Sequence, residues 1–149
     1  MEFRGEKHRQ IFQNYIRRQK HRPSAHHLAA VYLLTADKTL WKQVRGAFRD
    51  GKADLSAVHL CGIQPDAYAL FRSAKELLTG EPMVGLAELA ERDIIRPWVL
   101  NLFFQAILLS RGEHSGVLVK ANGIRYRHPF HEFAKIRSFY VCNRYFLFR

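Results

Sequence analysis

Residues 93–112 read DIIRPWVLNLFFQAILLSRG and form the most apolar stretch of the chain. They predict a helix that is capped by Asp93, runs to about Ser110 and is ended by Gly112. Phe104 and Leu108 widen its apolar stripe to almost the whole circumference, so we expect it to be the central helix of a bundle. The stretch is too short for a membrane span and contains polar residues, namely Arg96, Asn101 and Gln105.

Helical periodicity and capping residues predict further helices before this stretch. Ser24 is a good N-cap, Pro65 suits the first position of a helix, and Gly80 suits the residue after a helix. Asp50-Gly51 is a turn signal. Residues 52–64 are ambiguous, and residues 81–92 predict a loop or a short helix. The other predicted helices span Gly5–Lys20, Ala25–Thr35, Lys38–Phe48 and Pro65–Leu78.

From Gly116 onward, β-prone runs replace the helical pattern. Asn122-Gly123 separates two such runs and predicts a two-residue hairpin over about residues 116–128. One face of this hairpin is apolar and suits packing on the bundle, whereas the other carries Lys120, Arg125 and Arg127.

Two alternatives stay open for the residues after Pro129, namely a short helix and a third strand over Ser138–Phe148. We expect one domain over residues 1–149 of mainly α (α+β) class. It is predicted to be a bundle of five or six helices with a C-terminal β-hairpin or small sheet.

The size of the chain and its cysteines bound the class of protein. A chain of 149 residues buries enough surface to fold without metal ions or disulfides. Cys61 and Cys142 form no disulfide framework, which indicates a reducing cytoplasm. The N-terminal MEFRGEKHRQ lacks the apolar core of a signal peptide.

Charge is the most pronounced feature of the composition. The net charge is +11, and it is unevenly spread: residues 1–22 hold seven basic and two acidic side chains, and residues 114–149 hold seven and one. Residues 61–95 hold three basic and six acidic side chains. This polarity predicts contact with a polyanion, with the acidic stretch lying away from the basic ends or pairing with one of them.

Motifs for cofactor chemistry are missing from the sequence. The histidines lack the paired spacing of a zinc site, and His26 and His27 point in different directions on a helix. There is no glycine-rich phosphate loop and no nucleophile elbow. We therefore expect no metal and no cofactor, and we assign no catalytic residues.

The segment IRYRHPFHE, residues 124–132, is the one stretch that suggests catalysis. With five residues between Arg125 and His131, it loosely resembles the Arg-x(4–6)-His motif of the HEPN family of small helical ribonucleases. This resemblance implies that Arg125 steadies phosphate charge and His131 moves a proton in a metal-independent ribonuclease. The alternative pair, Arg127 and His131, is separated by only three residues.

Residues 2–48 faintly resemble an uncharacterised group of small helical proteins from bacteria and phages. The likeness lies in the AVYLL helix and the Trp41-to-Phe48 helix that follows it. It implies a helical N-terminal region and makes an origin in a mobile element conceivable. A second functional class is therefore an inhibitor of an RNA-guided nuclease, of anti-CRISPR type, that binds a protein or ribonucleoprotein target.

Our preferred interpretation is a non-catalytic protein that binds nucleic acid or a ribonucleoprotein through phosphate contacts. The apolar helix before the hairpin does not suit a recognition helix, so groove reading is not supported. Tyr140 and Tyr145 suit base stacking, although a place in the core is the favoured alternative for both. The oligomeric state stays open. Two groups of basic residues are predicted to make the contacts: Lys120, Arg125, Arg127, Lys135 and Arg137; and Arg4, Lys7, Arg9, Arg17, Arg18, Lys20 and Arg22.

Overall fold

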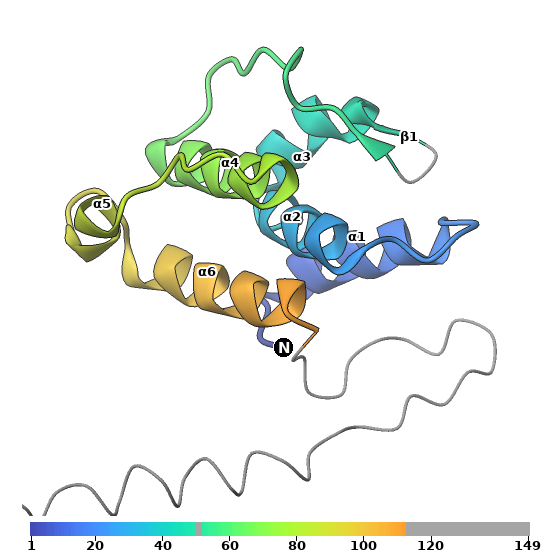
Figure 1. Cartoon of the computed structure of the whole chain (residues 1–149), viewed down its shortest axis with the longest axis horizontal. Coiled ribbons are helices and arrows are strands. Elements are labelled where there is room, and N and C mark those ends of the chain that lie inside the picture. The colour runs from blue at the N-terminus through green and yellow to red at the C-terminus, as the bar shows by residue number, and fades with distance from the viewer. Residues whose placement is uncertain (50–51, 113–149) are drawn as a thin grey trace, which may run out of the picture. The chain divides into compact units, whose positions relative to one another are not determined.

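A computed structural model describes residues 1–49 and 52–112, and these residues form a helical bundle with a small antiparallel sheet (Figure 1). The mainly helical fold class is therefore confirmed. The predicted hairpin at 116–128 and the alternatives for 138–148 lie outside the described residues. The elements are α1 (Glu6–Arg17), α2 (Ala25–Thr35), α3 (Lys38–Val44), the 3-10 helix η1 (Arg45–Ala47), β1 (Phe48–Arg49), β2 (Lys52–Ala53), α4 (Pro65–Thr79), α5 (Leu86–Ala90) and α6 (Pro97–Ser110).

Helix α2 lies at the centre of the bundle, and the prediction that the helix of residues 93–110 would be central is wrong. Every residue from His27 to Ala36 is buried, and α2 contacts α1, α3, α4 and α6. Ala29 and Ala30 are small, so neighbouring helices approach α2 closely. Helix α6, although more apolar, leaves Phe104 55% exposed. Apolar content alone therefore did not identify the centre.

Local capping chemistry sets several helix ends where it was expected. The Ser24 hydroxyl accepts a hydrogen bond from the backbone N–H of His27 at 3.2 Å, and α2 has the predicted bounds. Pro65 is the first residue of α4. Gly80 ends α4 with φ of 74°, a left-handed conformation that glycine adopts without steric cost.

Other predicted bounds are wrong. Helix α1 ends at Arg17 rather than Lys20, and α3 ends at Val44 rather than Phe48 because the chain turns into η1 and then into β1. Asp93 does not cap α6. Arg96 occupies that position, and its extended backbone is the conformation that a following proline favours, so the helix begins at Pro97.

The described sheet is a two-stranded ladder that sequence analysis did not predict. Phe48 pairs with Ala53, and Arg49 pairs with Lys52, in antiparallel register. Asp50-Gly51 stands between the two strands in the sequence, which is a dipeptide typical of hairpins. Within residues 1–49 and 52–112, no helix has the length and hydropathy that crossing a membrane requires.

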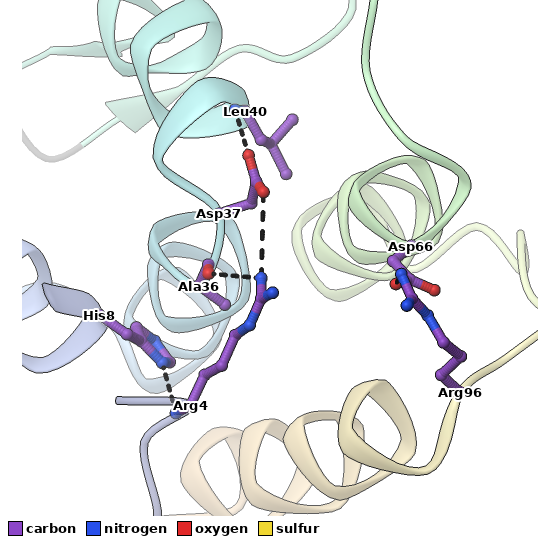
Figure 2. A network of polar contacts seen from close by, with 7 residues as sticks. All are labelled: Arg4, His8, Ala36, Asp37, Leu40, Asp66 and Arg96. Atoms are coloured by element: carbon purple, nitrogen blue, oxygen red, sulfur yellow. Dashed lines mark hydrogen bonds and ion pairs between the residues drawn. The ribbon is translucent and has the colours of Figure 1, made fainter. Parts of the chain in front are cut away.

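His8 holds the N-terminal segment on the bundle, and Figure 2 shows its contact with Arg4. His8 is buried, and its Nδ1 accepts the backbone N–H of Arg4 at 3.1 Å. Its Nε2 lies 2.8 Å from the carbonyl oxygen of Tyr32, which has no proton to give, so Nε2 carries the proton. Burial lowers the pKa of His8 to about 4, which keeps the ring neutral.

Arg4 is held by contacts with three elements. Its Nη1 donates to the carbonyl oxygen of Ala36 at 3.3 Å and lies 4.0 Å from the carboxylate of Asp37. Its guanidinium also lies over the ring of Trp98, 3.9 Å from the ring centroid. Although it belongs to the predicted basic N-terminal group, Arg4 thus joins the N-terminal segment to α2, α3 and α6.

Candidate nucleic-acid interface

Four aromatic side chains join α1, α2, α3 and β1. The rings of Tyr15 and Trp41 meet edge to face with centroids 5.6 Å apart, and Phe48 lies 5.8 Å from Trp41. His27 completes the group with its ring 5.3 Å from that of Phe48. Tyr15, Trp41 and Phe48 are half-buried, so this aromatic cluster is anchored in the core and reaches the surface.

Tyr15 and His27 form the polar contact inside this cluster. The hydroxyl of Tyr15 lies 2.5 Å from Nε2 of His27. Burial raises the pKa of Tyr15 to about 12 and lowers the pKa of His27, so both groups stay uncharged at neutral pH. His26 is exposed whereas His27 is buried, so the two point in different directions, as the sequence predicted. The pair is a neutral link between α1 and α2 in this structure.

Exposed basic side chains lie on three segments that adjoin the aromatic cluster in the sequence. On α3 and η1, Lys38, Lys42 and Arg45 recur at spacings of four and three residues and are all exposed. This spacing places them on one outer face, opposite the buried side chains of Leu40 and Val44.

The β1–β2 hairpin contributes two more cations. Arg49 and Lys52 are direct register partners, so both side chains stand on the same face of the ladder. They border a shallow hollow that Gly46, Ala47 and Asp54 complete. Opposed like charges destabilise a strand pair. A bound anion between them would relieve this repulsion, because it attracts both cations.

The third segment is the end of α1 and its connection to α2. Arg17, Arg18, Lys20 and Arg22 are all exposed there, in agreement with the expectation that they lie at the surface. Arg9, from the same predicted group, is exposed but forms an ion pair with Glu6. We call the following exposed cations the basic face: Arg17, Arg18, Lys20, Lys38, Lys42, Arg45, Arg49 and Lys52.

Within residues 1–49 and 52–112, none of these eight side chains has an acidic partner. The four ion pairs of that part of the chain involve other arginines, namely Arg4, Arg9, Arg72 and Arg96. The basic face therefore keeps its charge available to an external anion.

Acidic side chains gather elsewhere. Residues 76–93 hold five acidic side chains and one basic side chain, around α5. In Figure 1, α5 lies toward one side of the bundle, and the α1–α2 connection and β1 lie toward the other. Within the described residues, the acidic segment around α5 therefore lies away from the α1–α2 connection and β1, and the C-terminal basic group lies outside the described residues.

Sequence reasoning located part of this face. It singled out Arg17, Arg18, Lys20 and Arg22 but missed Lys38, Lys42, Arg45, Arg49 and Lys52. Asp50-Gly51, interpreted from the sequence only as a turn signal after a helix, is the feature that could have indicated the hairpin pair. The other predicted site residues lie outside the described ranges: Lys120, Arg125, Arg127, His131, Lys135, Arg137, Tyr140 and Tyr145.

The described ranges contain no group of three or more His, Cys, Asp or Glu side chains able to hold a metal ion. Comparison with known proteins found no matching family model, no similar curated protein and no similar solved structure.

Proposed function

We propose that this protein binds nucleic acid, or a nucleic-acid-containing complex, through phosphate contacts and without catalysis. The observation that carries the proposal is the basic face, whose eight exposed cations lack acidic partners in the described part of the chain. A phosphate backbone presents repeating negative charges at the spacing of a few ångströms, which a row of surface cations on rigid elements suits.

The rigidity of the elements supports this assignment. Lys38 and Lys42 stand on α3, whose residues Leu40 and Val44 are buried, and Arg45 follows on η1. Arg49 and Lys52 stand on a paired ladder next to the aromatic cluster. Cations that are held in place lose less conformational entropy on binding than cations on a loose tail. We also propose a cytoplasmic location, which the free and exposed thiol of Cys61 supports.

Fluorescence anisotropy with labelled single-stranded and duplex oligonucleotides, over a series of salt concentrations, tests the proposal. Each phosphate contact contributes a slope of about −0.9 for duplex DNA or about −0.7 for single strands in log K against log salt. Arg49→Glu combined with Lys52→Glu should weaken binding to all sequences and flatten this slope by the contribution of about two phosphate contacts.

A matched control separates local contacts from net charge. Arg49→Glu and Arg92→Glu change the net charge equally, but Arg92 lies among the acidic residues beside α5. Only Arg49→Glu should flatten the salt slope, by about one unit. Equal effects of the two variants, with both proteins folded, would show that binding depends on overall charge and that the basic face is not the site.

A further inference from the structure

An apolar groove opens between α4, α5 and α6, on elements that take no part in the basic face. Its buried floor includes Leu33 of α2 and Ala106 of α6, and its sides include Leu77 and Leu89. The open space is about 120 Å³. A cavity of about 150 Å³ holds a benzene molecule, so the groove has room for one aliphatic side chain.

The groove continues onto an uncovered strip of α6. Ile107 lines the groove and is 45% exposed, and Phe104 and Leu108 beside it are 55% and 39% exposed. These positions are spaced by three and four residues, so they share one side of the helix. Groove and strip together form a contiguous apolar surface of the kind that marks an interaction site.

The segment of residues 76–93, which supplies Glu76, Leu77, Val84 and Leu89 to the groove, holds five acidic side chains and one basic side chain. Glu76 lines the groove, and its carboxylate accepts the backbone N–H groups of Met83 and Val84, each at 3.1 Å, which holds the following loop in place. Glu88 is paired with Arg72 at 2.6 Å. Three exposed carboxylates have no cationic partner in the described part of the chain, namely Glu81, Glu91 and Asp93.

We propose that this surface, which we call the acidic-rimmed groove, binds a basic amphipathic helix of a partner protein. One aliphatic side chain of the partner would enter the groove, and the next apolar side chains along its helix would cover Ile107 and Phe104. Lysine or arginine side chains flanking that apolar stripe would pair with Glu81 and Glu91. This is the helix-in-groove mode of recognition, with charge complementarity selecting the partner.

Charge argues against two other occupants of the groove, namely nucleic acid and a second copy of this chain. Nucleic acid would be repelled by the rim. A second copy presenting the same groove would bring two acidic rims together, because a two-fold interface pairs a patch with itself. The basic helix α1 of a second copy is also unsuitable, since its apolar residue Phe12 is already buried in its own bundle.

The experiment uses the full chain and two synthetic peptides of about 14 residues, which is about four helical turns. Both peptides have the same leucine positions on one helical face, and the rest is lysine in one and glutamate in the other. Fluorescence anisotropy should show the Leu–Lys peptide binding at least about tenfold more tightly than the Leu–Glu peptide. The net charge of +11 favours the opposite order, so this result requires the local acidic rim.

Substitutions then locate the site. Ile107→Lys should reduce affinity for the Leu–Lys peptide at least about tenfold, whereas Tyr68→Lys should not, because Tyr68 is a similarly exposed apolar residue of α4 that does not line the groove. Glu81→Gln with Glu91→Gln should reduce the salt dependence of binding. Both apolar targets are exposed, so we expect each variant to fold, and circular dichroism checks that it does.

Three outcomes overturn the proposal. The first is equal binding of the two peptides, or binding of neither. The second is an unchanged affinity in folded Ile107→Lys. The third is self-association of the native protein in light scattering that Ile107→Lys abolishes, because the occupant would then be a second copy. The proposal does not rest on nucleic-acid binding, which Arg49→Glu tests separately.

Discussion

His8 should make the fold sensitive to mild acid. Its pKa is lowered from 6.5 to about 4, mainly because the ring is buried and secondarily because the Arg4 guanidinium is near. In the unfolded chain His8 returns to its ordinary pKa, so the unfolded state binds more protons between the two values. Stability is therefore fully present above about pH 6.5 and is lost as pH falls through about 4.

The magnitude follows from the same two values. One pKa unit corresponds to about 1.4 kcal/mol. Full protonation of His8 in the unfolded chain therefore lowers the free energy of unfolding by about 3 kcal/mol. Domains are typically stable by about 5–15 kcal/mol. A loss of this size is thus a large fraction of the whole. Burial also lowers the pKa of His27, which adds to the loss in the same direction.

Urea denaturation followed by circular dichroism, at several pH values between 7.5 and 4, measures this loss. His8→Gln keeps a donor for the Tyr32 carbonyl but does not titrate. As the pH is lowered from 7.5 to 4, the free energy of unfolding of this variant should therefore decrease by up to about 3 kcal/mol less than that of the native chain. The carboxylates and His27 are common to both proteins and cancel in the comparison. Parallel pH dependences, or an NMR titration that gives His8 a pKa near 6.5, would refute the reasoning.

Three further substitutions test the helix ends by the same denaturation measurement. Ser24→Ala removes the hydroxyl that accepts from the His27 N–H and should cost about 1 kcal/mol, whereas Ser24→Thr should cost little. Asp37→Ala removes the 2.8 Å cap on Leu40 and the contact with Arg4, so it should cost about 1–2 kcal/mol. Gly80→Ala should cost about 1 kcal/mol through backbone strain alone, since φ is 74° and nothing lies within 4 Å of an added Cβ; Gly80→Asn should be better tolerated.

The helix ends that sequence predicted well are those governed by neighbours in the chain. Ser24 caps α2, Pro65 begins α4 and Gly80 ends it, because each acts on backbone groups within three or four residues. The start of α6 was missed since two local signals competed. Asp93 suited a cap, but Pro97 suits the first helical position and forces an extended conformation on Arg96.

The order of burial was harder to predict because it depends on partners distant in the sequence. Both α2 and α6 are apolar, yet α2 is enclosed by four helices and α6 keeps one side open. The amino-acid composition of a helix indicates how much apolar surface it could bury, and the number of neighbouring helices decides how much it does bury. The exposed Phe104 and Leu108, which led to the wrong assignment of the centre, form with Ile107 the strip beside the acidic-rimmed groove.

The charged residues of the chain separate into two kinds that their sequence positions do not distinguish. Arg4 and Arg96 have acidic partners and aromatic neighbours, so they stabilise the fold and their contacts shield their charge. Arg45 and Arg49 have no acidic partner within residues 1–49 and 52–112, although they carry the same charge as Arg4 and Arg96. Replacing the first kind should therefore lower stability, whereas replacing the second should leave it almost unchanged and alter only the binding of anions. The net charge of +11 is only the excess of basic over acidic side chains, and the ion pairs decide which of the cations a polyanion meets.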